Sequence, residues 1–207
     1  MKTAEPDHNI NISFLKLNYM LRNLSSLILL TALVLPASLS AQRYFTRDAK
    51  VYFDATSKDS PERIEATAKS GTIVLDASSG KLEAAVLVKN FLFERALMQE
   101  HFNENYLESS KYPKAIFKGK FEDASKVDFS KDGTYNPTLS GELTLHGKTK
   151  QVKVPAKVQV KGGKATASAS FTVTLSDFDI SVPSVVSDKL AKEAKISIDA
   201  ELEPMKK

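Results

Sequence analysis

The sequence predicts an all-β fold: an antiparallel up-and-down barrel of about eight strands with one short amphipathic helix. Apolar and polar residues alternate with period two through most of the chain after residue 43, and glycine, serine and proline residues separate the alternating segments. Strands that each carry one apolar face must bury these faces together and dispose of two sheet edges. A closed barrel does both, whereas a two-sheet sandwich leaves edges unpaired.

Residues 20–41 have the pattern of a secretory signal peptide. Arg22 provides a positive charge, residues 27–35 (LILLTALVL) form an apolar run too short to cross a bilayer, and residues 36–41 (PASLSA) supply small residues for cleavage. We therefore expect a periplasmic or secreted protein without a transmembrane anchor after processing. Residues 1–19 either lengthen this segment or precede a true start at Met20, which we favour, and residues 42–207 form the expected domain.

Composition and charge exclude several classes of function. The chain has no cysteine, so neither a disulfide framework nor a thiolate metal site can form. Basic and acidic residues are interspersed without a block of like charge, which gives no support to nucleic-acid binding. We expect no cofactor and no metal, and the sequence does not indicate an oligomeric state.

The first strands are predicted from alternation between residues 45 and 88. A turn at Ser78-Ser79-Gly80 separates two of them. The positions expected on the apolar face are Phe45, Ala49, Val51 and Phe53, then Ile73 and Leu75, then Leu82, Ala84, Val86 and Val88.

A helix is predicted for residues 94–106, between two strands. Apolar positions recur at helical spacing, and polar residues occupy the opposite side. The residues expected on the apolar side are Leu97, Met98, His101, Phe102 and Tyr106. Pro113 cannot continue the helix and favours an extended conformation at Tyr112, so the chain returns to the sheet at residues 115–117. Such a helix governs access to the barrel, either as a plug or as a wall of its mouth.

The later strands include a hairpin with long arms. Gly162 and Gly163 form a two-residue turn between two alternating segments. The inward positions are Leu139, Gly141, Leu143 and Leu145, then Val152, Val154, Ala156, Val158 and Val160, then Ala165, Ala167, Ala169, Phe171, Val173 and Leu175, and finally Ile196, Ile198, Ala200 and Leu202. The consecutive inward alanines leave two outcomes open: large residues fill the interior, or a cavity remains.

Three motifs resemble the YceI-like family, a periplasmic lipocalin-like barrel regarded as a polyisoprenoid-binding fold. They are residues 101–117 (HFNENYLESSKYPKAIF), residues 139–150 (LSGELTLHGKTK), and Phe171 followed by residues 177–180 (DFDI). The resemblance extends from about Tyr44 to Leu202. Residues 55–68 depart from it, because they are shorter than in many members and lack an aromatic hairpin, so the length of the ligand is left undecided.

The resemblance implies a binding protein without catalytic activity. Its ligand would be a polyisoprenoid, an isoprenoid quinone or another lipid, held inside the barrel. The candidate ligand-binding residues are Phe91, Phe93, Leu97, Met98, His101, Phe102, Phe117, Leu143, Ala165, Ala167, Ala169, Phe171 and Phe178.

Two alternatives remain at this point. The barrel could be filled and serve as an interaction or stress-response module, or it could be an enzyme that acts on a small apolar substrate with His101 as the base. No nucleophile-elbow or phosphate-loop motif supports catalysis. We expect His146 to lie in solvent, and Asp177 and Asp179 to share the outer face of a strand.

Overall fold

The computed structural model describes residues 42–205, and the expectations for the leader fall outside this range. The strands are β1 (Arg43–Thr56), β2 (Glu65–Asp76), β3 (Lys81–Leu87), β4 (Leu92–Phe93), β5 (Lys114–Phe121), β6 (Gly133–Tyr135), β7 (Thr138–Leu145), β8 (Lys148–Lys161), β9 (Lys164–Thr174) and β10 (Leu190–Pro204). The α-helix is α2 (Ala96–His101), followed by a π-helical turn, η2 (Phe102–Tyr106). Short 3₁₀ turns are η1 (Val88–Asn90), η3 (Ala124–Lys126), η4 (Leu175–Phe178) and η5 (Ser184–Val186). Between residues 42 and 205, no helix is long and apolar enough to cross a membrane.

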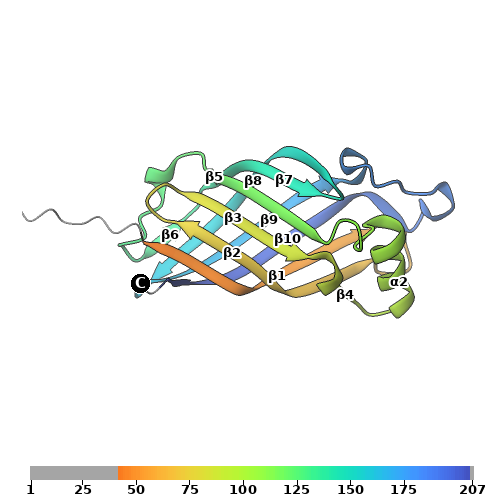
Figure 1. Ribbon diagram of the computed structural model, residues 1–207, viewed down its shortest axis with the longest axis horizontal. Coiled ribbons are helices and arrows are strands. Elements are labelled where there is room, and N and C mark those ends of the chain that lie inside the picture. Colours follow the sequence, from red (N-terminus) through yellow and green to blue (C-terminus); the bar gives the residue numbers. More distant parts are fainter. Residues whose placement is uncertain (1–41, 206–207) are drawn as a thin grey trace, which may run out of the picture. The chain divides into compact units, whose positions relative to one another are not determined.

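Eight strands close into an antiparallel barrel, as the sequence predicts (Figure 1). The order around the barrel is β1-β10-β9-β8-β7-β5-β3-β2, and β2 pairs with β1 to complete it. The two short strands lie outside this circuit: β4 pairs with β2, and β6 pairs with β8. Closure pairs both edges of the sheet, which removes the exposed edge that an open sheet would present.

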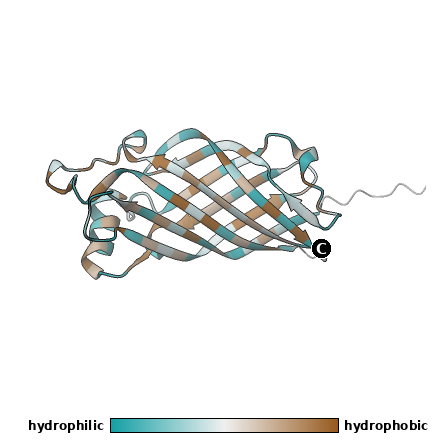
Figure 2. Cartoon of the chain, turned by 180° about the vertical axis from the view of Figure 1, so that it is seen from behind, coloured by the Kyte–Doolittle hydropathy of each residue, from teal (hydrophilic) through white to brown (hydrophobic). Residues whose placement is uncertain are grey.

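Alternation along the strands sets an apolar interior against a polar exterior. Figure 2 shows hydrophobic and hydrophilic residues following one another along each long strand. The β8–β9 hairpin turns at Gly162 and Gly163, whose φ angles of 58° and 78° are the positive values that a tight two-residue hairpin turn requires. Its arms place Val158 opposite Ala167 and Val160 opposite Ala165, so the inward residues predicted for the two arms face one another.

A β-bulge in β1 changes which of its residues face the barrel interior, so one prediction for this strand is wrong. Thr46 pairs with Ile73 of β2, but Ala49 already pairs with Gly71, so β1 carries one residue more than its partner over this interval. The extra residue shifts the alternation, and Tyr44 rather than Phe45 is fully buried. Phe45 therefore faces outward, whereas Ala49 and Val51 lie inside as expected.

Two groups of buried side chains pack the two ends of the barrel. One includes Phe91, Phe102 and Phe178, and the other includes Tyr44 and Phe129. Both groups pack against the same partly buried residues in the middle, which are Phe117, Val152, Phe171 and Ile198. Incomplete burial of inward-facing apolar side chains in the middle of the barrel indicates unfilled space beside them.

Residues 91–112, which we call the roof, lie at one end of the barrel and contain β4, α2 and η2 (Figure 1). Phe102 anchors this segment, because its ring lies 5.4 Å from that of Phe53, 5.6 Å from that of Phe91 and 5.0 Å from that of Phe93, measured between ring centroids. These contacts fix which side of the helix faces the barrel.

Candidate functional site

An internal cavity of about 180 Å³ lies between the two packed ends. Its wall is built almost entirely from alanine, valine, leucine, isoleucine and phenylalanine residues of the barrel strands and the roof. Because such a wall offers neither charge nor a convergent set of hydrogen-bonding groups, it can hold an apolar molecule but cannot orient a polar one.

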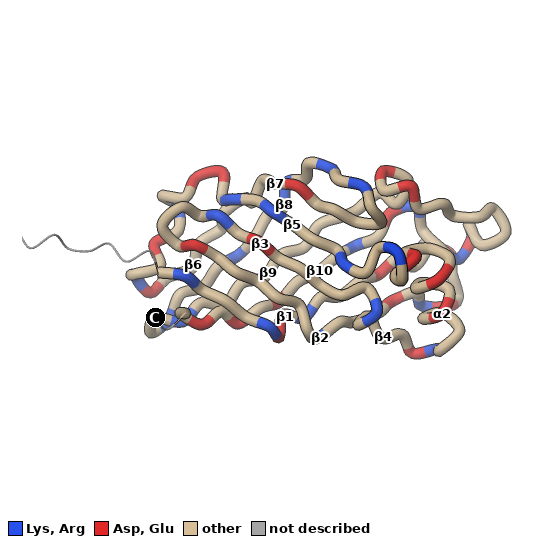
Figure 3. The backbone as a smooth tube through the Cα atoms, in the orientation of Figure 1, with Lys and Arg blue, Asp and Glu red and all other residues tan. Residues whose placement is uncertain are grey.

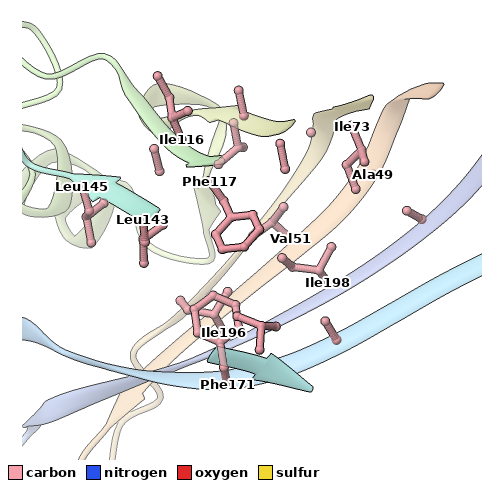
Figure 4. A pocket seen from close by; sticks show the side chains of 18 of the residues that line it. Ala49, Val51, Ile73, Ile116, Phe117, Leu143, Leu145, Phe171, Ile196 and Ile198 are labelled. Atoms are coloured by element: carbon pink, nitrogen blue, oxygen red, sulfur yellow. The ribbon is translucent and has the colours of Figure 1, made fainter. Parts of the chain in front are cut away.

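Phe117 and Phe171 reach into this space from opposite walls. Phe117 comes from β5 and Phe171 from β9, and Figure 4 shows both rings within the space enclosed by Val51, Leu143 and Ile198. The phenylalanines narrow the interior without filling it. The two outcomes that the sequence left open therefore occur together, with large side chains present and a cavity beside them.

Part of the candidate set lies on the cavity wall. The residues that do so are Phe91, Phe102, Phe117, Leu143, Ala167, Ala169 and Phe171. The alanines matter because they leave the β9 wall free of long side chains, while Phe171 follows directly on the same face.

The remaining candidates lie away from the cavity wall. Phe93 packs against Phe102, and Ala165 and Phe178 are buried in the packed ends. Met98 is half-buried, whereas Leu97 is 62% exposed and His101 is exposed. The inward stripe of the helix is Met98, Phe102 and Tyr106, four residues apart, so the prediction that Leu97 and His101 share its apolar side is wrong.

Several wall residues were absent from the predicted set. They are residues of the barrel ends and middle such as Leu107, Leu145, Leu175, Ile180, Ile196 and Ile198. The alternation already placed Leu145, Leu175, Ile196 and Ile198 on inward faces, so the signal was present for these four. Leu107 and Ile180 follow helical turns, where no period-two pattern exists to reveal them.

His146 is not in solvent, contrary to the prediction. Its side chain is only 12% exposed, and it adopts a positive φ of 49° in the β7–β8 turn. Nδ1 lies 3.0 Å from the carbonyl oxygen of Phe178, and Nε2 lies 2.9 Å from Oε2 of Glu108. The ring of Tyr112 meets the imidazole edge to face at 4.9 Å between centroids. His146 therefore joins three segments around the roof end of the cavity.

The two carboxylates near residue 178 are exposed, but they are not on a strand. Residues 175–178 form the 3₁₀ turn η4, and Asp179 has a positive φ of 55°. Lys148 Nζ lies 2.8 Å from Asp179 Oδ2, and this hydrogen bond, together with the lysine charge, lowers the pKa of Asp179. The pair is a surface interaction that positions the β7–β8 turn beside η4.

One buried polar atom in the packed end opposite the roof has no partner among the described residues. The side chain of Tyr44 is fully buried, its ring lies 5.0 Å from that of Phe129, and its hydroxyl makes no hydrogen bond. Burial raises the pKa of this phenol. Tyr44 is not one of the residues that line the cavity, so its hydroxyl is not part of the site.

Comparison with solved structures identifies related barrels. A polyisoprenoid-binding domain from Saccharophagus degradans, implicated in plant cell wall breakdown, superposes with a TM-score of 0.67 at 10% identity, covering 80% of this chain and 99% of that one. BcnA from Burkholderia cenocepacia gives 0.59 at 20% identity, with 74% and 95% covered. The YCEI protein of Campylobacter jejuni gives 0.55 at 20% identity, with 70% and 87% covered. At these identities the likeness shows a shared fold.

Comparison of the sequence itself gives the family. No curated protein matches the chain. The YceI-like domain matches residues 46–202, which is well over half of the chain and spans every strand of the closed barrel. The chain belongs to the YceI-like domain family.

Proposed function

We propose that the barrel binds and carries a long apolar ligand without chemical conversion. The observation that carries this proposal is the interior wall, which is apolar around its whole circumference and lies within a closed sheet. The ligand classes that fit are polyisoprenoids, isoprenoid quinones and other lipids with long unbranched or branched tails. The polyisoprenoid-binding domain of Saccharophagus degradans, which shares the fold, supports this choice.

The energetics favour a ligand of several isoprene units. Burial of one unit contributes roughly 3–4 kcal/mol at about 0.8 kcal/mol per methylene. Association itself costs on the order of 4–15 kcal/mol, so one or two units bind poorly and several bind well.

The cavity must enlarge to hold such a ligand. An engineered cavity of about 150 Å³ holds benzene, and the space here is about 180 Å³. Phe117 and Phe171 are only partly buried, so rotation of their rings together with displacement of the roof is the route by which the interior lengthens. The filled-barrel alternative corresponds to a chain in which this enlargement does not occur.

The catalytic alternative required His101 to face the cavity. His101 lies exposed on α2 and is not on the cavity wall. Basic and acidic residues are interspersed along the described strands and loops, and the view in Figure 3 shows no stretch of one sign. We place the carrier in the periplasm, on the basis of the leader pattern at residues 20–41.

Mass spectrometry of ligand released from the purified protein tests the proposal. The protein is prepared without detergent; one portion is denatured in organic solvent so that its extract can be analysed, and a second, folded portion is offered quinones and isoprenols for rebinding. A stoichiometric lipid, or saturable rebinding, supports a carrier. An empty extract together with failed rebinding would overturn it in favour of the filled barrel.

Ala167→Phe locates the ligand. Ala167 lies on the cavity wall opposite Val158 and Ala200, so a phenyl ring there occupies the cavity and should abolish binding while the fold persists. Thr166→Phe is the matched control, because Thr166 is exposed on the outer face of the same strand. Equal affinity in the two variants would exclude an internal site.

A further inference from the structure

His146 holds together three segments that each supply a wall residue of the cavity. Its partner Glu108 follows Leu107 in the roof, His146 itself follows Leu145 at the end of β7, and its second partner Phe178 lies between Leu175 and Ile180. Because these neighbours all line the cavity, separation of the three segments would open the cavity wall at this end. We call the Glu108–His146–Phe178 arrangement the clasp.

The clasp requires a doubly protonated imidazole. Both partners of the ring are acceptors: the Phe178 carbonyl oxygen lies 3.0 Å from Nδ1, and a carboxylate oxygen of Glu108 lies 2.9 Å from Nε2. A neutral imidazole has one N–H and can satisfy only one of them. When the second proton leaves, a ring nitrogen lone pair faces an oxygen lone pair, and the contact becomes repulsive.

Charged and titratable groups surround the ring from every segment that packs on it. They are Glu108, Lys111 and Tyr112 from the roof side, Lys148 and Lys150 from β8, and Asp179 after η4. Lys111 lies over the ring of Tyr112 at 4.9 Å, and Lys148 is paired with Asp179 at 2.8 Å. Lys148 is thus engaged by Asp179, whereas the charge of Lys111 also acts on Glu108. Glu108 is the only carboxylate bonded to the ring among residues 42–205.

We propose that the clasp is a proton-controlled gate on the roof end of the cavity, closed when His146 carries both protons and released when it loses one. The proposal rests on the proposed carrier function for its biological use, but the closing of the roof is a property of the chain without ligand. The gate loosens with rising pH, because loss of a proton removes one of the two donors of the ring, and comparison of pH 5 with pH 8 covers the interval in which side-chain imidazoles as a class change charge. A lipid would then exchange faster at neutral to alkaline pH than at acidic pH.

Glu108→Gln distinguishes a proton-controlled gate from a simple structural contact. The side-chain amide keeps the shape of Glu108, but its N–H can donate to the bare Nε2 of a neutral ring whose Nδ1–H still bonds Phe178. This variant should hold the roof closed at both ends of the pH range. His146→Asn tolerates the positive φ but is too short to reach Glu108, so it should leave the roof loose throughout. His101→Gln is the control, because it removes an exposed histidine from the roof itself.

Hydrogen exchange of the unliganded chain measures how firmly the roof segment that carries Glu108 is held. The amides of Leu107 and Ser109, on either side of Glu108, are bonded to the carbonyl oxygens of Phe102 and Asn103, so their protection factors report local opening of this segment. Protection in the wild-type chain should fall about tenfold from pH 5 to 8, the loss expected for one charge-assisted hydrogen bond. Glu108→Gln should abolish this fall, and His101→Gln should retain it. Equal protection at both pH values, or an unchanged fall in Glu108→Gln, would overturn the gate.

Transfer of retinol to vesicles of zwitterionic lipid tests the consequence for a bound isoprenoid. Retinol is fluorescent and uncharged throughout this range, so any change in its release rate comes from the protein. Release should accelerate about tenfold with rising pH in the wild type and stay slow in Glu108→Gln. A chain that shows the protection change but binds neither retinol nor other isoprenols has the gate and lacks the carrier function. A chain that releases retinol at a constant rate lacks the gate.

Discussion

Gly119 of β5 pairs with Gly141 of the adjacent antiparallel strand β7, and the ring of Phe117 lies over Gly119. A Cβ atom on Gly119 would stand 2.6 Å from Cζ of Phe117 and 2.7 Å from the carbonyl oxygen of Ser140. A Cβ on Gly141 would collide with the backbone of Lys118 and Gly119. Gly119 thus leaves room for the Phe117 ring beside the cavity, and Gly141 allows the close approach of the β5 backbone.

Gly141→Ala should lower the free energy of unfolding by about 1–3 kcal/mol, because the clash is with backbone atoms that cannot rotate away. Urea denaturation measures the change. Ser140→Ala, on the neighbouring position of the same strand, should change stability by less than about 0.5 kcal/mol. Equal effects of the two substitutions would show that the β5–β7 pair can spread to admit a methyl group.

Phe102→Ala should destabilise the chain by about 3–5 kcal/mol, because it removes the ring that packs on Phe53, Phe91 and Phe93. Leu97→Ala on the same helix is the matched control, since Leu97 is 62% exposed. Its effect should stay within about 0.5 kcal/mol. A comparable loss in both variants would contradict the assignment of the buried stripe to Met98, Phe102 and Tyr106.

Tyr44→Phe should raise the free energy of unfolding by about 1 kcal/mol, because the hydroxyl is buried without a hydrogen bond and its removal relieves a desolvation cost. Thermal and urea unfolding measure the gain. Tyr135→Phe should act in the opposite direction, since the Tyr135 hydroxyl donates to the carbonyl oxygen of Lys131 at 2.9 Å. A loss of stability in Tyr44→Phe would reveal a bound water or another partner at that hydroxyl.

Tyr52 should make the stability depend on alkaline pH. Burial, followed by the hydrogen bond that its hydroxyl donates to Glu65, raises the pKa of Tyr52 from 10.0 to about 12. The unfolded chain then releases this proton first as the pH rises, so the stabilisation is complete below about pH 10 and is lost toward about pH 12.

Absorbance titration of the phenolates, alongside urea unfolding at increasing pH, follows this loss. Tyr52→Phe should remove the highest-pH step of the titration and flatten the stability profile over the same interval. A profile with the same slope in both proteins would assign the alkaline transition to other groups.

The strand faces were predictable because burial on one side of a sheet imposes a period of two, and residues 164–174 display that period without interruption. The β1 bulge was not predictable, because Thr46-Arg47-Asp48 contains no glycine or proline to mark the added residue. One inserted residue reverses the facing of every position on its far side, which is why Phe45 was misplaced.

The roof shows where local pattern stops being informative. Leu97 with His101, and Met98 with Phe102 and Tyr106, form two adjacent stripes at the same spacing, and only the contacts of Phe102 with distant strands decide which one is buried. His146 is a stronger case, since its partner Glu108 lies 38 positions earlier in the chain. Neither the turn before Gly147 nor the residue types around it indicates that contact.

Because β1 pairs with β10, the barrel can close only after the last strand of the chain has been synthesised. Tyr44 pairs with Pro204 and Val51 with Ile198, so the first strand of the barrel cannot complete its hydrogen bonds until the last has emerged. The β8–β9 hairpin needs only local chain and can form early, whereas closure is a late step that spans almost the whole domain. A chain that stops before Leu190 would leave β1 and β9 as two bare edges, and such a fragment should aggregate instead of folding as a smaller barrel.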